Sequence, residues 1–174
     1  MKRRYLAAAV AVVLMAGVAR AEDAAPADEI LGQWYTDKNE SKVEVVKKDG
    51  KYFGTIIWLA EPKYPADDAE AGKIKHDRFN PDKAAQKNPT IGIQVLKNFS
   101  YDAADKSWSG GTIYDPAHGT TYKCVIRFQD DPKGVDGKSL FVRGYVGIQI
   151  LGRTTVWYRV PKDQMEKTAE AKGK

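Results

Sequence analysis

The chain has 174 residues, with 28 lysines and arginines, 23 aspartates and glutamates, one cysteine and a formal net charge of +5. A single cysteine excludes an internal disulfide, so packing alone has to hold the fold. The positive charge favours a nucleic-acid partner only if it belongs to the folded part of the chain.

The N-terminus has the pattern of an export signal. Lys2, Arg3 and Arg4 precede an apolar run over residues 5–18, and Ala19-Arg20-Ala21 places small residues where a signal peptidase cleaves. We expect residues 1–21 to be removed as a Sec-type signal peptide, because the apolar run is too short to favour a membrane anchor. Cys124, the one cysteine, is remote from this segment, which excludes a lipoprotein. The expected location is periplasmic or secreted, with no membrane span after cleavage.

Cleavage changes the charge. Of the 28 basic residues, Lys2, Arg3, Arg4 and Arg20 leave and no acid leaves, so 24 remain against 23 acids, a net of +1. Basicity then no longer indicates nucleic acid, and none is expected as a partner. The remaining roughly 150 residues suffice for one domain with its own core. We expect a flexible lead-in over residues 22–29, the domain over 30–160, and a disordered polar tail over 161–174.

The domain is predicted to consist of strands joined by short turns. The first strand, residues 30–36, contains Gly32-x-Trp34, and the next two flank Asp49-Gly50, a pair that favours a two-residue hairpin. No internal repeat and no amphipathic helix longer than a turn or two interrupts the pattern. The other predicted strands are 42–48, 51–59, 91–99, 107–114, 120–128, 139–146 and 153–160.

The clearest hairpin covers residues 107–128. Asp115 can cap the turn through its side chain, Pro116 presets φ, and Gly119 can take the positive φ that closes a type I turn with a bulge. We therefore predict that these three residues set the register of the two strands.

Eight strands paired in chain order protect their edges by closing into a barrel or by splitting into a sandwich. Short links favour an all-β, eight-stranded antiparallel up-and-down barrel, since a Greek-key sandwich needs a long connection and only residues 60–90 supply one. These residues form an irregular insertion between strands 3 and 4, with one helical turn expected near 81–86. The insertion is either a functional, lid-like loop or a solvated connection. The barrel interior is either filled or holds one small ligand.

Two sets of residues resemble known families. Gly32-x-Trp34, with Arg159 two residues after Trp157, resembles the lipocalin and calycin pattern, in which a last-strand arginine packs over the first-strand tryptophan. More specifically, DRFNPD (77–82), WSGGTIYDPAHGTTYKC and LFVRGYVGIQILGRTTVWYRV resemble the DUF2147 family, exported bacterial proteins of unknown function, over about the whole domain. The resemblance implies a lipocalin-like barrel closed by Gly32, Trp34 and Arg159, and it names no activity.

Several side chains are candidates for ligand contact. Arg143 is the strongest polar candidate, because an arginine inside an apolar barrel needs a partner and a ligand carboxylate offers a bidentate one. Alternatively it points outward or pairs with an internal acid such as Asp115. Parity leaves the last two strands ambiguous, since a shift of one residue exchanges their faces. The candidates are Tyr114, Tyr122, Arg143, Tyr145 and Trp157.

No catalytic or metal-binding pattern is found. His76, Asp77, Asp82 and His118 lack the spacing of zinc ligands, and Cys124 favours a role as a small buried apolar residue. No nucleophile elbow, Walker loop or dinucleotide fingerprint is present. An enzyme is therefore the least favoured class, and no metal or cofactor is expected.

These observations predict an exported barrel that binds a small apolar or lipid-like ligand, with or without an anionic group. The alternative is a cell-envelope protein-interaction module that acts through the barrel surface or residues 60–90, without a small-molecule ligand. The oligomeric state is left open.

Overall fold

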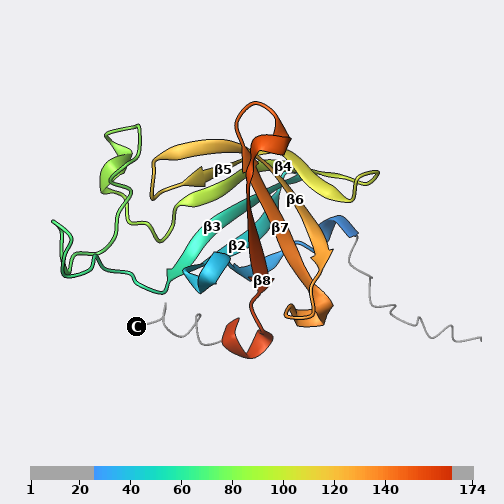
Figure 1. The fold of residues 1–174 in the computed structure, drawn as a ribbon, viewed down its shortest axis with the longest axis horizontal. Helices are drawn as coiled ribbons and strands as arrows, with labels where there is room; N and C mark the ends of the chain where they lie inside the picture. Colours follow the sequence, from blue (N-terminus) through green and yellow to red (C-terminus); the bar gives the residue numbers. More distant parts are fainter. Residues whose placement is uncertain (1–25, 166–174) are drawn as a thin grey trace, which may run out of the picture.

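The chain folds into a closed barrel of eight antiparallel strands in sequence order (Figure 1). The structure, a computed structural model, describes residues 26–165, so the predicted signal peptide and most of the predicted tail lie outside the described residues. The strands are β1 (Gly32–Tyr35), β2 (Ser41–Lys48), β3 (Lys51–Leu59), β4 (Gln94–Asp102), β5 (Ser107–Asp115), β6 (Thr120–Asp130), β7 (Lys138–Tyr145) and β8 (Arg153–Arg159). The predicted all-β barrel with an insertion between strands 3 and 4 is confirmed.

Within residues 26–165, five short 3-10 helices lie before the first strand and in the connections between strands. Their bounds are η1 (Pro26–Asp28), η2 (Asp37–Asn39), η3 (Ala85–Lys87), η4 (Val135–Gly137) and η5 (Gln149–Leu151). The helical turn expected near residues 81–86 thus lies slightly later, at η3. The barrel closes where β8 returns to β1, through the pairs Trp34 with Arg159 and Tyr35 with Tyr158.

The predicted fourth strand is corrected at its start and in its alternation. The regular strand begins at Gln94 instead of Ile91, because Gly92 has a φ of 103°. Gly92 and Ile93 still exchange backbone hydrogen bonds with Ile56 of β3, of 2.8 and 2.9 Å. Asn98 then takes a φ of 63°, and the resulting bulge shifts the parity of the strand. Leu96 and Phe99, three residues apart, are consequently both buried in the core at 1% exposure.

One end of the barrel is filled by aromatic side chains, which pack with the other apolar residues of the core. The Trp34 and Phe128 ring centroids are 6.0 Å apart, and Phe128 lies 5.6 Å from Trp108. Trp108 in turn contacts Tyr101 at 5.0 Å and Tyr52 at 6.3 Å. We call these five residues the aromatic cluster and this end of the barrel, which also carries η1, the closed end.

The Gly110-Gly111 pair makes room for the core. Gly110 takes a φ of 72° at a point where the register of β5 against β6 shifts, so it forms a bulge. A β-carbon at Gly111 would lie 2.5 Å from the Phe99 ring, so only glycine lets this ring cross the interior there. The diagnostic Gly-Gly of this segment is therefore explained by packing.

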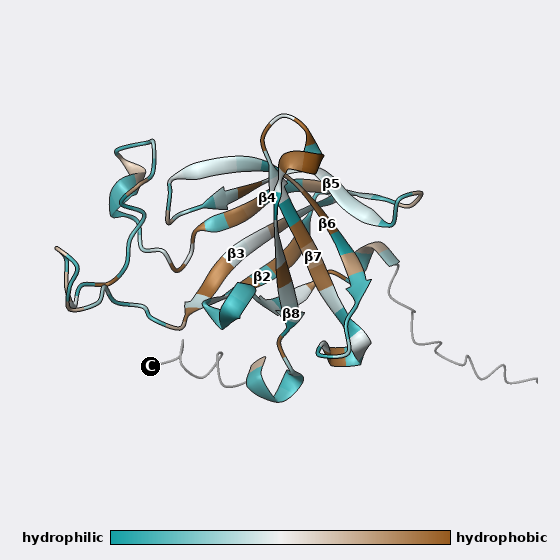
Figure 2. Ribbon diagram, viewed as in Figure 1, coloured by the Kyte–Doolittle hydropathy of each residue, from teal (hydrophilic) through white to brown (hydrophobic). Residues whose placement is uncertain are grey.

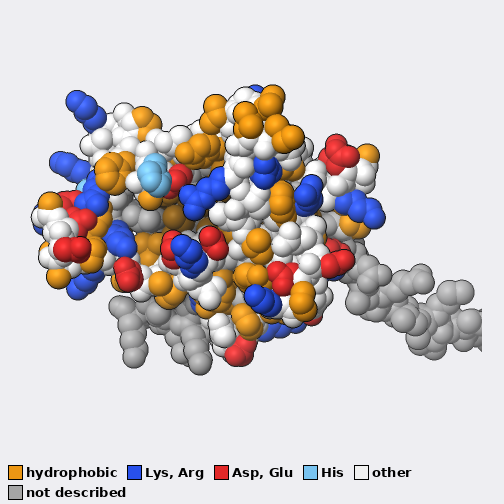
Figure 3. Space-filling view, in the orientation of Figure 1, with side chains coloured by type: hydrophobic (Ala, Val, Ile, Leu, Met, Phe, Trp, Pro, Cys, Tyr) orange, Lys and Arg blue, Asp and Glu red, His pale blue; other side chains and the backbone are white. Residues whose placement is uncertain are grey.

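The insertion, residues 60–93, is ordered and lies to one side of the barrel with charges of both signs on its surface (Figures 1 and 3). Isolated bridges join Lys63 to Ile74 and His76 to Pro89. Arg78 donates two hydrogen bonds to Asp68, of 2.9 and 2.8 Å, and its guanidinium lies 4.2 Å from the centre of the Tyr64 ring. The insertion thus has a polar core of its own.

Asp77 anchors the insertion to the barrel. Its side chain accepts hydrogen bonds of 2.6 Å from the Tyr114 hydroxyl of β5 and of 2.6 Å from Asn80, and only 2% of the residue is exposed. A β-carbon at Gly119 would overlap the carbonyl of Phe79, so the insertion also rests against the β5–β6 turn. The DRFNPD and GGTIYDP segments therefore meet in space.

Acid is expected to loosen the insertion. Hydrogen bonds from Arg78, aided by the Glu70 backbone, lower the pKa of Asp68 from its usual 3.8 to about 2. A carboxyl whose pKa is depressed on folding contributes its full stability above its ordinary pKa and loses it as the pH falls through the folded value. Hydrogen exchange of residues 62–90 should therefore accelerate between about pH 4 and pH 2, relative to that of β5 and β6.

Asp68→Asn removes the titrating group and provides the control. This variant should show faster exchange of the insertion at neutral pH and a weaker dependence on pH over the same interval. Exchange that changes equally in the insertion and in the barrel strands would contradict the assignment, since it would indicate global unfolding.

Candidate ligand-binding site

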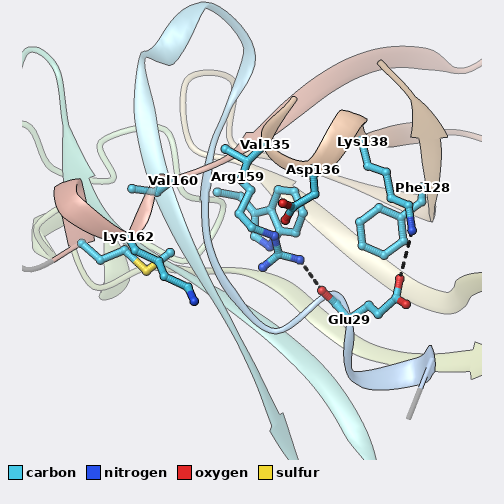
Figure 4. Close-up of a pocket in the computed structure, with 10 residues that line it drawn as sticks. Glu29, Phe128, Val135, Asp136, Lys138, Arg159, Val160 and Lys162 are labelled. Atoms are coloured by element: carbon cyan, nitrogen blue, oxygen red, sulfur yellow. Dashed lines mark hydrogen bonds and ion pairs between the residues drawn. The ribbon is translucent and has the colours of Figure 1, made fainter. Parts of the chain in front are cut away.

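At the closed end, Arg159 (Figure 4) stacks on a tryptophan of the first strand, and we call this pair the floor of the barrel. The Arg159 guanidinium lies 4.2 Å from the centre of the Trp34 ring, and it donates hydrogen bonds to the carbonyls of Leu31, at 2.9 Å, and Glu29. Trp34 Nε1 donates to the Ile30 carbonyl at 2.8 Å. Burial lowers the pKa of Arg159. Arg159 thereby ties β8, β1 and the N-terminal segment together.

Gly32 completes this arrangement. It has a φ of 112°, and a β-carbon there would lie 3.4 Å from the Arg159 guanidinium. A cleft of about 630 Å³ lies outside this floor, lined by Trp34, Phe128, Lys138 and Arg159 among others. Lys138, in the wall of this cleft, is engaged with Glu29, at 3.8 Å. The arrangement has the contacts that a structural closure requires.

The inner face of the barrel becomes more exposed away from this floor. In β6, Ile126 and Cys124 are each 1% exposed, whereas Tyr122, two residues nearer the opposite end, is half-buried. The same change occurs from Gly111 to Ile113 in β5, from Val142 to Gly144 in β7, and from Trp157 to Thr155 in β8. On these four strands the inner face is therefore partly exposed at the end opposite the aromatic cluster, whereas Leu96 of β4, which pairs with Ile113, and Ile56 of β3 stay buried. We call the partly exposed region, bounded by Ile113, Tyr122, Gly144 and Thr155, the open half.

The walls of the open half are apolar and closely spaced. Ile113 pairs with Tyr122 across β5 and β6, and a β-carbon at Gly144 would lie 3.2 Å from the Ile113 side chain and 3.4 Å from that of Tyr122. Glycine at this position thus keeps the inner face free of a further side chain. Ile113 and Tyr122 therefore pack close to Gly144 and form an apolar surface on the inner face.

Cys124 and Trp157 lie below these walls. Burial raises the pKa of the Cys124 thiol to about 12, so the thiol stays neutral and lacks the character of a nucleophile. Trp157 is 4% exposed, and its Nε1 donates to the Thr155 hydroxyl at 3.1 Å. Among the predicted ligand residues, the structure therefore brings Tyr122 and Trp157 to the inner face.

Arg143 and Tyr145 lie on the outer face of β7, away from these residues. Cys124 pairs with Gly144 on the inner face, so the neighbouring pairs, Val125 with Arg143 and Lys123 with Tyr145, face outward. Arg143 donates to the carbonyls of Gln149 and Ile150, at 2.8 and 2.7 Å, and to the Thr154 hydroxyl, at 2.7 Å. Its donors are thus used by the β7–β8 connection, and we propose no ligand contact for it.

Tyr114 also faces outward, although it belongs to the same hairpin as Tyr122. Its hydroxyl is hydrogen-bonded to Asp77, and burial, together with that bond, raises its pKa. It lines a second cleft, of about 600 Å³, between the insertion and the outer face of β4 to β6, with Asn80, Lys97 and Thr112. The predicted ligand residues are therefore divided between two faces of the sheet.

Asp115, Pro116 and Gly119 form the β5–β6 turn. The Asp115 side chain accepts a hydrogen bond of 2.9 Å from the Ala117 backbone, and Gly119 has a φ of 64°. Asp115 pairs with Thr120, and this is the pair of β5 and β6 that lies next to the turn.

Arg153 is a rim residue that sequence reasoning missed. It pairs with Gly144, so it occupies an inner-face position at the mouth of the open half, and it is exposed. No hydrogen bond or ion pair engages its side chain within residues 26–165. The signal in the sequence is the alternation of β8: Arg153, Thr155 and Trp157 are two residues apart, so they lie on the same face of the strand.

Neither metal ligands nor a membrane-spanning helix are found in the part of the chain that the structure describes. No three His, Cys, Asp or Glu side chains there are placed to share a metal ion. No described helix has the length and apolar character needed to cross a bilayer.

Replacement of Arg159 by leucine should destabilise the protein by about 1–3 kcal/mol, because the stack on Trp34 is lost and the carbonyls of Leu31 and Glu29, the first of them part-buried, lose their donor. Arg153→Leu, in the same strand but exposed, is the matched control and should change stability by less than about 0.5 kcal/mol. Urea denaturation followed by tryptophan fluorescence measures both. Equal effects of the two substitutions would show that the stack does not close the barrel.

Comparisons with known proteins agree with this architecture. A solved structure described as protein HP1028 from the human pathogen Helicobacter pylori, which its title places in the lipocalin family, superposes with a TM-score of 0.61 at 20% identity. The match covers 81% of this chain and 89% of that chain, and at this identity it shows the fold alone. No curated protein matches the sequence. The family model described as "Uncharacterized protein conserved in bacteria (DUF2147)" matches residues 32–159. The chain therefore belongs to the DUF2147 family.

Proposed function

We propose that this protein is an exported barrel that binds a small apolar or lipid-like ligand in the open half. The observation that carries the proposal is the loss of burial along the inner face of β5 to β8, for example from Cys124 and Val142 at 1% exposure to the half-buried Tyr122 and Gly144. The interior of an eight-stranded barrel is either filled by side chains or holds one small ligand. Since the aromatic cluster occupies the closed end, the ligand is confined to the opposite half.

The chemistry of the walls favours an apolar ligand. Ile113, the Tyr122 ring and the neutral Cys124 thiol present little that would pair with a buried charge. A polar group on the ligand is best placed at the mouth, where Arg153 is exposed and can bind a carboxylate or phosphate through two parallel hydrogen bonds. The expected ligand is therefore an amphiphile such as a fatty acid, with its chain inward and its anionic group at the rim.

Export is supported by the basic and apolar pattern of residues 1–21 and the Ala19-Arg20-Ala21 cleavage pattern. An apolar ligand fits that location, since such molecules need a carrier in aqueous compartments. No enzymatic activity is proposed, because the Cys124 thiol is buried and both Asp77 oxygens are engaged by Tyr114 and Asn80.

Ligand binding is tested by native mass spectrometry after mild purification and by titration with a fluorescent fatty acid. Thr155→Phe and Ile113→Trp each fill the open half, and both should abolish uptake while circular dichroism and melting temperature show a folded barrel. Arg153→Gln should weaken binding of the fatty acid about tenfold and leave binding of the matching alcohol unchanged.

Lys133→Gln, an exposed substitution at the closed end, is the control and should bind as wild type does. A wild-type protein that takes up neither probe, or folded filling variants that bind as well as wild type, would reject the proposal.

A second candidate function is protein interaction through the insertion. Its specific support is that an ordered segment exposes large apolar side chains, with Ile74, Phe79 and Ile91 at 54%, 53% and 41% exposure. Such residues on a charged surface are typical of binding sites for proteins.

Replacement of residues 62–90 by a short glycine-serine linker separates the two candidates. If the insertion is the functional element, pull-down of a cell-envelope partner should be lost while uptake of the fluorescent fatty acid is retained. Loss of uptake with retained pull-down would favour the ligand-binding function, and the folded state of the variant is checked by circular dichroism.

A further inference from the structure

The β7–β8 loop, residues 146–152, exposes an apolar patch beside the mouth of the open half. Val146, Ile148, Ile150 and Leu151 are 71%, 61%, 77% and 78% exposed. Figures 2 and 3 show the loop as an apolar prominence above the strands. Isolated apolar residues are common on protein surfaces, but several in one short segment indicate an interaction site. We call these four residues the loop patch.

The loop is held in this conformation by Arg143. The guanidinium donates to the Gln149 and Ile150 carbonyls and to the Thr154 hydroxyl, so the loop backbone faces the barrel wall. The backbone N–H of Gly152 also donates to the Gln149 carbonyl at 3.0 Å, which closes the η5 turn. With its polar backbone groups engaged, the loop presents its side chains outward. The exposure of the loop patch is therefore built into the fold.

The charged residues that flank the loop patch along the chain are basic. No acid occurs between Asp136 and Asp163, whereas Arg153 follows the loop directly. Lys123 pairs with Tyr145 at the base of the loop and is exposed. An apolar tip with basic residues at its base has the chemistry of a segment that inserts into a membrane interface containing anionic lipids. A second copy of the chain fits less well, because it would bring the same basic residues together.

We propose that the loop patch docks this protein on an anionic phospholipid surface. Ile148, Ile150 and Leu151 enter the boundary between headgroups and acyl chains, and Lys123 and Arg153 contact the phosphates. Docking in this orientation directs the mouth of the open half at the lipid surface. The inference goes beyond ligand binding and does not depend on it, since it rests on the loop patch and its charges alone.

The test is flotation of the mature protein, residues 22–174, with vesicles of phosphatidylethanolamine and phosphatidylglycerol and with vesicles of phosphatidylcholine alone. Wild type should float with the anionic vesicles, more weakly at high salt, and much less with the neutral ones. Ile150→Asp and Leu151→Asp should each reduce binding about tenfold or more, because a charge replaces an inserted side chain. Val135→Asp is the matched control, since Val135 is 37% exposed at the closed end, and it should bind as wild type does.

Two further measurements keep the inference falsifiable. Ile148→Trp places a reporter in the loop patch, and brominated acyl chains should quench its added fluorescence if the loop is inserted. Uptake of a soluble fatty-acid probe by Ile150→Asp, measured without vesicles, should equal that of wild type, which separates this inference from the ligand-binding proposal. Absence of vesicle binding, equal binding by Ile150→Asp, or a wild-type dimer that Ile150→Asp converts to a monomer would overturn the inference.

Discussion

The stack of Arg159 on Trp34 is the contact on which the barrel depends. An eight-stranded sheet has two free edges unless its last strand pairs with its first, and β1 and β8 are joined here by few backbone pairs, one of which is Trp34 with Arg159. Arg159 strengthens this seam through the ring of Trp34 and through the carbonyls of Glu29 and Leu31. Arg159 thus contacts the first strand, from the last, and also the segment that precedes β1.

The two ends of the barrel differ in how completely side chains fill them. The aromatic cluster fills the closed end, and glycine at positions 54, 111 and 144 keeps neighbouring side chains from colliding across the interior. At the opposite end the inner-face residues of β5 to β8 are only half-buried, and the insertion and the β7–β8 loop emerge there (Figure 1). The structural contacts of the floor thus lie at one end of the barrel, and the proposed ligand site and lipid contact lie at the other.

Arg143 and Arg153 have different surroundings because the strand register places them on opposite faces of the sheet. Arg143 faces outward, where the β7–β8 loop satisfies its donors, and this contact orders the loop patch. Arg153 is exposed at an inner-face position of the mouth, because it pairs with Gly144. A second contact between distant segments, Tyr114 with Asp77, fastens the insertion to the barrel wall and explains why its polar residues form an ordered unit.

The sequence by itself determined the strands and turns of the barrel, because period-two alternation and turn chemistry such as Asp49-Gly50 and Asp115-Pro116 act over a few residues. It also indicated the partnership of Trp34 and Arg159 through a family resemblance. Only the tertiary structure decided which faces of β7 and β8 point inward, since both carry apolar residues and parity cannot choose between them. The bulge at Asn98 reset the parity of its strand, and the loss of burial along the inner face emerges only when all strands are closed together.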